Sequence, residues 1–220
     1  LPETITSFKG LNSLTDFDNL YVYYLPNLVS LEGLENVQTM STNTSIQYSG
    51  IVNLSGFDNL NYAQHVNIQN NEDLVSINAM NSLENVNNSI FISSNANLKT
   101  VNGFNNLVSV GNGVGISFSS ALETISGFDK IETITNTLNM SNNPSLTEVN
   151  GFNMLTSVGG DVDLRGNSSL QNIDFLENVV VGNGVRVDSA YTGDKLSSDS
   201  VFCLSNDNFL SGDKSLVCEG

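Results

Sequence analysis

The chain carries a short alternating segment that recurs every 22 to 24 residues, and this period constrains the fold more than any other feature. Each segment centres on one apolar residue. The set is Tyr21-Val22-Tyr23, Ser45-Ile46-Gln47, Asn67-Ile68-Gln69, Phe91-Ile92-Ser93, Gly115-Ile116-Ser117, Asn139-Met140-Ser141, Asp163-Leu164-Arg165 and Arg186-Val187-Asp188. A unit this short cannot bury its own apolar side, so it must stack on its neighbours and share one continuous core with them.

Two more apolar groups follow most of the alternating segments. Six residues after the central position stands a leucine, and three residues later an isoleucine, valine or leucine. A corner of the type Gly-Phe-x-x-Leu comes next, as in Gly103-Phe104 followed by Leu107. Because Asn, Gly and Ser separate these stretches, they are too short for helices. The sequence predicts an all-β solenoid with three faces per coil and parallel sheets, in which equivalent residues lie about 4.8 Å apart.

Two recurrent residue types mark the corners of the coil. The glycine of the Gly-Phe corner predicts either a positive φ or a close approach of two backbones, and Ala79 and Phe175 interrupt its column. Asparagines stand three residues after several strand centres, where their amides can satisfy the backbone of a turn and bond along the stack. We interpret this column as a structural ladder rather than a binding site; its members are Asn71, Asn95, Asn143 and Asn167.

The pattern Val66-x-Ile68-x-x-Asn71-x-x-Leu74-x-x-Ile77 resembles a leucine-rich repeat. Together with the Gly-Phe-x-Asn-Leu corner, it is similar to the receptor L-domain family, which includes bacterial surface and fungal cell-wall proteins. The similarity covers about residues 5 to 188. It implies a short right-handed parallel β-helix whose broad sheet meets a protein or glycan. Repeats report packing and not function, and the cysteine-rich modules and kinase of the receptors are absent, so receptor signalling is not implied.

The charge balance excludes one large class of partner. The chain has 7 Lys and Arg against 23 Asp and Glu, a formal net charge of -16. Nucleic acids and anionic lipid surfaces are bound through clustered cations, so we expect no nucleic-acid partner. The sequence also lacks a run of about 18 apolar residues, which predicts no membrane insertion within this chain.

The two cysteines, Cys203 and Cys218, lie close together near the end of the sequence. Such a pair is more typical of a terminal disulfide than of a redox site. We therefore divide the chain into a receptor-L-domain-like solenoid over residues 1–189 and a disulfide-bonded cap over residues 190–220. A disulfide requires an oxidising compartment, which predicts a secreted or cell-surface protein.

A search for catalytic residues yields few candidates, and we predict no enzyme active site, metal or cofactor. His65 is the only histidine and has no matching nucleophile or carboxylate signature, so we interpret it as a surface histidine. The alternative is a carbohydrate-active enzyme, a polysaccharide lyase or hydrolase on a β-helix. The best candidate for such an active site is the place where acidic and basic residues gather on neighbouring coils. We interpret this group instead as a cross-strand salt-bridge patch; its members are Asp161, Asp163, Arg165 and Arg186.

The outward positions of the first strand column form the candidate binding face. Side chains alternate between the two sides of a strand, so Val22 and Ile46 point inward and their neighbours outward. Tyrosine and phenylalanine among amides suit contact with an extracellular protein or a glycan, although the same rings would also suit packing under a neighbouring segment. The predicted binding residues are Tyr21, Tyr23, Gln47, Asn67, Gln69 and Phe91, and Ser45 is expected to point outward with them.

Overall fold

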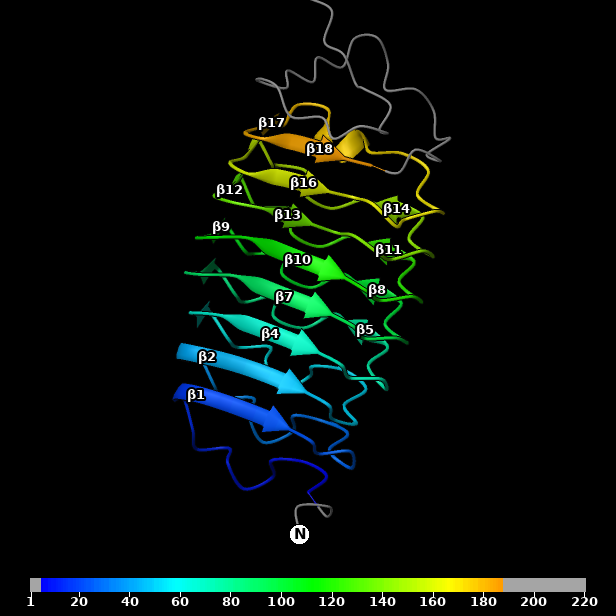
Figure 1. Cartoon of the computed structure of the whole chain (residues 1–220). Coiled ribbons are helices and arrows are strands. Elements are labelled where there is room, and N and C mark those ends of the chain that lie inside the picture. Colours follow the sequence, from blue (N-terminus) through cyan, green and yellow to red (C-terminus); the bar gives the residue numbers. More distant parts are fainter. Residues whose placement is uncertain (1–4, 188–220) are drawn as a thin grey trace, which may run out of the picture.

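The computed structural model describes residues 5–187, which form a solenoid of parallel strands stacked along one axis (Figure 1). This confirms the predicted all-β solenoid of about 24 residues per coil. The first row of strands forms the broad face. It consists of β1 (Asp16–Tyr23), β2 (Thr39–Gln47), β4 (Val66–Gln69), β7 (Ile90–Ser93), β10 (Val114–Ser117), β13 (Leu138–Asn139), β16 (Asp161–Asp163) and β18 (Gly184–Arg186).

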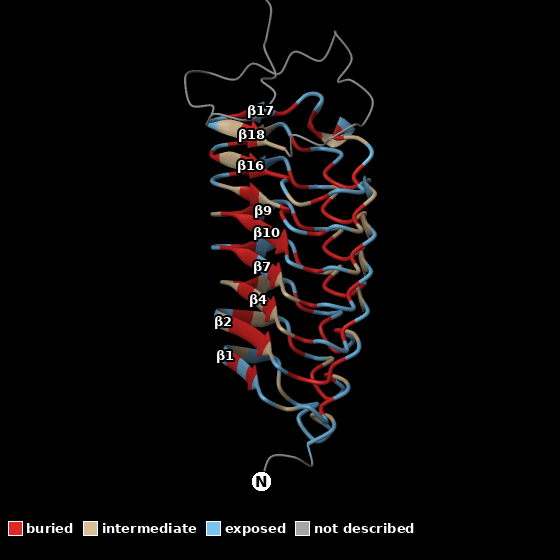
Figure 2. Ribbon diagram, turned by 45° about the vertical axis from the view of Figure 1, so that its right-hand side comes forward, coloured by how far each residue is buried: buried red, intermediate tan, exposed pale blue. Residues whose placement is uncertain are grey.

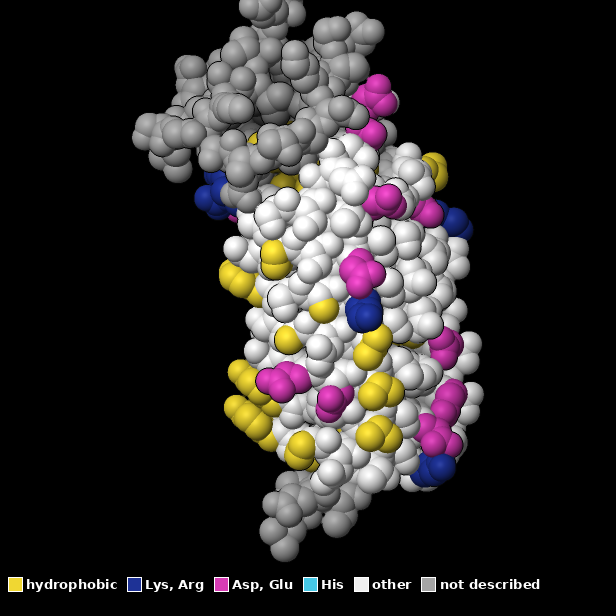
Figure 3. Space-filling model, turned by 90° about the vertical axis from the view of Figure 1, so that its right-hand side faces the viewer, with side chains coloured by type: hydrophobic (Ala, Val, Ile, Leu, Met, Phe, Trp, Pro, Cys, Tyr) yellow, Lys and Arg dark blue, Asp and Glu magenta, His cyan; other side chains and the backbone are white. Residues whose placement is uncertain are grey.

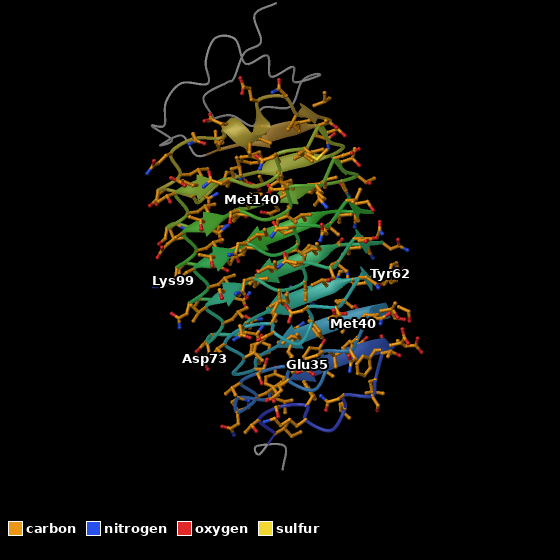
Figure 4. The ribbon with its side chains drawn as sticks, turned by 180° about the vertical axis from the view of Figure 1, so that it is seen from behind. Glu35, Met40, Tyr62, Asp73, Lys99 and Met140 are labelled. Carbon is orange, nitrogen blue, oxygen red and sulfur yellow. The ribbon has the colours of Figure 1, made fainter. Side chains whose placement is uncertain are left out.

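Two further rows complete each coil. The second row continues from β2 through β3 (Tyr62–Ala63), β6 (Asn85–Val86), β9 (Ser109–Val110), β12 (Thr133–Ile134), β15 (Ser157–Val158) and β17 (Val180–Val181). The third row is a separate sheet of β5 (Ser76–Ile77), β8 (Thr100–Val101), β11 (Thr124–Ile125) and β14 (Glu148–Val149). Viewed from behind, Tyr62 of the second row and Lys99, just before β8 of the third, lie at opposite edges of the molecule (Figure 4).

The long strand β2 connects the first two rows. Its first residues pair with β3 and its last residues with β4. A single strand therefore spans both rows in this coil, whereas each later coil has a separate strand in each row. The only helical segment within residues 5–187 is the short 3-10 helix η2 (Asp174–Leu176). No helix in this part of the chain is long and apolar enough to cross a membrane.

The core is a set of apolar columns enclosed by the three rows (Figure 2). The central residues of the alternating segments, among them Val22, Ile46, Ile92 and Ile116, are almost completely buried. In the register of β7 and β10, Ile92 is paired with Ile116, so each inward residue lies beside its own kind in the next coil. Burying one such side chain contributes roughly 1.5–3 kcal/mol, so the repeated apolar position holds the stack together.

The Gly-Phe-x-x-Leu segment is a turn and not a strand. The Leu107 amide donates to the Phe104 carbonyl, and the third row of strands is separate from this corner. The predicted positive φ occurs at Gly33 and Gly56, whereas in later coils the next residue adopts it: Met80 after Ala79, and Phe104, Phe128 and Phe152 after glycines. Ala79 is therefore tolerated in the glycine column, because its own φ is not positive.

Close backbone approach explains the glycines of these later coils. A β-carbon at Gly127 would lie 2.0 Å from the Gly103 carbonyl oxygen, which no side chain could accommodate. The phenylalanine rings that follow the glycines enter the core and stack on one another, with centroids 4.8 Å apart for Phe104 and Phe128 and 5.0 Å apart for Phe128 and Phe152. Close approach also occurs at Gly33 and Gly56, so both predicted reasons apply in those coils and close approach alone in the later ones.

The asparagine column is a buried hydrogen-bonded ladder, as the sequence predicts. The Asn71 amide nitrogen of the backbone donates to Oδ1 of Asn95, and that of Asn143 donates to Oδ1 of Asn167. Each side-chain amide also donates to backbone carbonyls of the same or a preceding coil. Ser49 and Ser119 occupy the same column and bond to Asn71 and Asn143. The predicted cap over residues 190–220, with Cys203 and Cys218, lies outside the described residues.

Candidate functional site

The six predicted binding residues occupy two adjacent outward columns on the first row. Strand register pairs Tyr21 with Ser45, Ser45 with Asn67, and Asn67 with Phe91. The second column contains Tyr23, Gln47 and Gln69, each paired with the next. Because neighbouring strands are about 4.8 Å apart, the side chains lie next to one another across β1, β2, β4 and β7. We call this surface the aromatic–amide face.

The aromatic residues of this face are the exposed ones. Tyr21 is 53% exposed, Tyr23 42% and Phe91 41%, while the three amide residues are half-buried between them. Ser45 differs from its expected outward exposure, since it is buried. The Tyr23 hydroxyl and Nε2 of Gln47 both donate to the Ser45 hydroxyl oxygen, at 2.9 and 3.0 Å, and their side chains cover it.

Hydrogen bonds also fix the orientation of Tyr21. Nδ2 of Asn43 donates to the Tyr21 hydroxyl oxygen at 3.2 Å, and that hydroxyl donates to Oδ1 of Asn19 at 3.4 Å. The rings of Tyr21 and Tyr23 are 5.7 Å apart and tilted by 31°. Both tyrosines are therefore held by polar contacts at their tips, and their rings form an ordered surface before any partner arrives.

Phe91 lies between a histidine and a glycine. Its ring contacts the His65 ring edge-on, with centroids 5.6 Å apart. On the other side, a β-carbon at Gly115 would lie only 2.9 Å from Cδ1 of Phe91, so the ring occupies space that any other residue at position 115 would fill. Gly115 is paired with Phe91 in the register of β7 and β10. The glycine thus permits the observed position of the Phe91 ring.

Two polar atoms beside Phe91 have no hydrogen-bond partner. They are Nδ1 of His65 and Oδ1 of Asn67, the buried unpaired side-chain atoms found within residues 5–187. Each such atom costs roughly 1–3 kcal/mol relative to a bonded one. Burial also lowers the pKa of the His65 imidazole below its ordinary value of 6.5, which favours the neutral ring. Sequence analysis placed His65 on the surface but did not detect its contact with Phe91.

The aromatic–amide face is bordered by uncharged residues along its two columns and directly after the strands. From Tyr21 to Asn142, the outward columns of the first row and the residues that follow its strands contain no Asp, Glu, Lys or Arg. The first charged residue in the Tyr21 column is Asp163 in β16. A chain with 23 acidic residues therefore keeps these columns free of them, and the two acids of β1, Asp16 and Asp18, stand earlier in that strand and accept hydrogen bonds from Thr39 and Ser41.

A second aromatic pair, which sequence analysis missed, borders this face. Tyr24 and Tyr48 follow β1 and β2 directly, adopt positive φ angles of 54° and 52°, and stack with ring centroids 4.8 Å apart. Both rings are exposed, as is Phe118 at the equivalent place after β10. The 24-residue spacing between the two tyrosines was a usable signal, but they were not considered because they lie outside the alternating segments.

The third row presents a smaller apolar stripe. Val29, Val52 and Val75 are half exposed, and hydrogen bonds between their backbones place them on successive coils. Lys99 and Glu123 continue the same column, so charged residues follow the apolar ones along this side of the molecule (Figure 3). The valines offer neither aromatic rings nor amides, which makes this stripe a weaker candidate than the aromatic–amide face.

The predicted charged patch consists of ion pairs. Arg165 contacts both carboxylate oxygens of Asp163, at 3.0 and 2.6 Å, within one strand segment. Arg186 lies 3.1 Å from Asp161 on the neighbouring strand, which is the expected cross-strand pairing. Burial raises the pKa of the Asp163 carboxyl, but hydrogen bonds from Arg165 and the charges of Arg165 and Arg186 outweigh this effect and lower it overall. Within residues 5–187, no three His, Cys, Asp or Glu gather closely enough to hold a metal ion.

Comparisons with known proteins add no relative to this description. No protein-family model, curated protein or solved structure matches the chain. The resemblance to receptor L domains therefore depends on the repeat residues alone.

Proposed function

We propose that this protein is a non-catalytic recognition or adhesion module, secreted or displayed on a cell surface, that binds an extracellular protein or glycan through the aromatic–amide face. The observation that carries the proposal is the combination of exposed, ordered aromatic rings with half-buried amides on an uncharged surface. Aromatic residues supply a large contact area at little entropic cost, and amides supply oriented donors and acceptors.

The backbone beneath this face supports the proposal. The face is built on β-strands and not on loops, and each strand is paired on one or both sides. Rigid elements hold binding groups more precisely than loops do. Because Tyr21 and Tyr23 are already oriented by hydrogen bonds, a partner would lose little free energy in ordering them.

The charged residues that would carry an enzymatic function have other roles. Asp163 and Asp161 form ion pairs with Arg165 and Arg186, and their charges are used in holding the last two strands of the first row. His65 packs against Phe91 with one nitrogen buried. These contacts favour recognition over the alternative of a polysaccharide lyase or hydrolase.

The proposal is tested by removing two aromatic side chains of the face, one from each of its two columns. The double variant Tyr23→Ala with Phe91→Ala and the wild type are compared on a glycan array and against immobilised candidate extracellular proteins. We expect the variant to lose binding to whichever probe retains the wild type, because both rings lie in the contact surface. The matched control is Phe118→Ala, which removes a still more exposed ring outside the two columns.

Two results would contradict the proposal. Undiminished binding by the folded double variant would place the contact surface elsewhere on the solenoid. Turnover of a polysaccharide by the wild type, measured as released reducing ends or unsaturated products with and without added calcium, would favour the enzymatic alternative. Surface substitutions of this kind should leave the melting temperature within a few degrees of the parent value, which verifies that the variants are folded.

A further inference from the structure

We infer that the partner of the aromatic–amide face is an uncharged oligosaccharide that lies along the stacking direction of the coils. This inference depends on the proposed function, because it assigns a ligand class to the same surface. It is carried by the charge, the hydrogen-bonding capacity and the spacing of the side chains on the face.

The charge distribution excludes anionic ligands first. The chain has a net charge of -16, and no Lys or Arg of the outward columns lies nearer to the face than Arg165. An anionic glycan or an acidic peptide would therefore meet repulsion without a compensating cation. A basic ligand would gain little, because the face itself contains no carboxylate. An uncharged ligand is the class that this surface accommodates without an electrostatic cost.

The polar groups of the face match hydroxyl groups. Gln47, Asn67 and Gln69 each present an amide that both donates and accepts hydrogen bonds, and a sugar hydroxyl does the same. Oδ1 of Asn67 and Nδ1 of His65 have no partner within the protein. A hydroxyl can bond to either tautomer of the imidazole, since it can act as donor or acceptor. Both atoms are buried beside Phe91, whose ring contacts His65 edge-on.

The spacing of the aromatic rings suggests the direction of the ligand. Tyr21 and Phe91 stand in the same column and are separated by three strand spacings, or about 14 Å along the stack. Ser45 and Asn67 lie between them in that column. A short sugar chain can place apolar ring faces against both aromatic residues and hydroxyls against the amides in the middle. A chain lying across the coils would reach one aromatic end only.

A protein partner fits this composition less well. The cores of protein interfaces are enriched in Met and Arg beside aromatic residues and depleted in Ser. On this face no Met or Arg projects outward from β1 to β10, while the Tyr23 column continues into Ser93 and Ser117 beyond Gln69. Serine and amides in place of Met and Arg favour a hydroxyl-rich ligand over a protein surface.

Gly115 enters this inference as a positioning residue for Phe91. A β-carbon at position 115 would displace Cδ1 of the Phe91 ring, although Gly115 does not itself need to touch a ligand. Its φ is not positive, so alanine is compatible with the strand backbone there. Gly115→Ala should therefore weaken binding through the altered position of Phe91.

The experiment measures retention of the protein on insoluble neutral polysaccharides (cellulose, chitin, β-1,3-glucan and mannan) and on anionic polygalacturonate and alginate gels. We expect retention on at least one neutral polysaccharide, with little dependence on salt, and none on the anionic ones. Phe91→Ala and Tyr21→Ala should each weaken this retention by roughly tenfold, as expected for loss of one stacking contact. In the Phe91→Ala background, Gly115→Ala should have no further effect.

Three outcomes separate failure of the ligand class from failure of the face. No retention on any neutral polysaccharide, or retention on the anionic ones alone, overturns the oligosaccharide inference. If a purified extracellular protein binds instead and the Tyr23→Ala with Phe91→Ala variant releases it, the proposed face stands and its ligand is a protein. If a neutral polysaccharide retains the wild type and the double variant equally, both the ligand site and the proposed function at this face are wrong.

Discussion

The two ends of the first row of strands share one backbone register but carry opposite surfaces. From β1 to β7, the two outward columns that start at Tyr21 and Tyr23 carry aromatic rings, amides and serines, and none of these residues is charged. At the other end, β16 carries Asp163, Arg165 follows that strand and β18 carries Arg186; Arg165 pairs with Asp163, and Arg186 pairs with Asp161. The inward residues at both ends are apolar and buried. Packing therefore determines the inward column of every coil, while the outward columns can vary without disturbing the fold.

This difference teaches where to look for function in a solenoid. A residue type that recurs in most coils, such as the inward aliphatic residues or the ladder asparagines, is explained by contacts with the coils above and below. The aromatic–amide face is not explained in that way. Tyr21 and Phe91 stand in the same column as Asn139 and Asp163, so stacking of the coils does not require an aromatic residue at this position. The proposed function is based on this surface, because stacking of the coils does not account for its chemistry.

The largest expected effect is on stability. It comes from placing an aspartate on the inward side of a strand and comparing it with an aspartate on the outward side of the same strand. Ile92 is fully buried, whereas its neighbour Phe91 is exposed. Ile92→Asp should unfold the array, since an unpaired carboxylate in an apolar core costs several kcal/mol in addition to the lost burial. Phe91→Asp should leave the protein folded. Thermal unfolding followed by circular dichroism distinguishes them, and equal melting temperatures for the two variants would show that the register is wrong.

The repeat made most of the fold predictable from the sequence. The spacing of Val22, Ile46 and Ile92 determined which residues point inward, because side chains alternate between the two sides of a strand and equivalent residues of successive coils must stack. The asparagine ladder followed from the same period. The Gly-Phe corner was less predictable: the glycine adopts positive φ at Gly33, but Phe128 adopts it after Gly127, although a carbonyl of the previous coil approaches both glycines closely.

The candidate site was predictable in position but not in detail. Alternation placed Tyr21, Tyr23 and Phe91 on one face, yet it also predicted an exposed Ser45. That residue is buried because two neighbouring side chains donate hydrogen bonds to it. The repeat period predicts which residues lie side by side, but it does not predict the contacts that their side chains make. The same reason applies to the position of Phe91 between His65 and Gly115.

A smaller effect is expected at the charged end of the row. The pKa of Asp163 is lowered in the folded chain, so its ion pair stabilises the fold fully above the ordinary carboxyl pKa near 4 and loses this contribution as the pH falls through the lowered value. Asp163→Asn should cost about 1 kcal/mol near neutral pH, since Arg165 is half exposed. Denaturant unfolding of both proteins across this pH range should give converging stabilities in acid. A constant difference at all pH values would contradict the assigned ion pair.

The smallest effect is expected at the uncharged end, where His65 titrates without a charged neighbour in its column. Desolvation lowers the pKa of His65 in the folded chain, so the neutral ring is favoured and protonation opposes folding. The contribution of the neutral ring is therefore fully present above the ordinary value of 6.5 and is lost as the pH falls through the lowered pKa. His65→Phe keeps an aromatic ring beside Phe91 and removes the titrating group, so the variant should lose a small pH dependence of stability, below about 1 kcal/mol, between pH 7 and pH 5. Denaturant unfolding at the two pH values measures this, with Phe118→Ala as a control that leaves the histidine in place. If His65→Phe retained the pH dependence of the parent, some other group would be responsible, and the ring of His65 would not be desolvated beneath Phe91 as the structure places it.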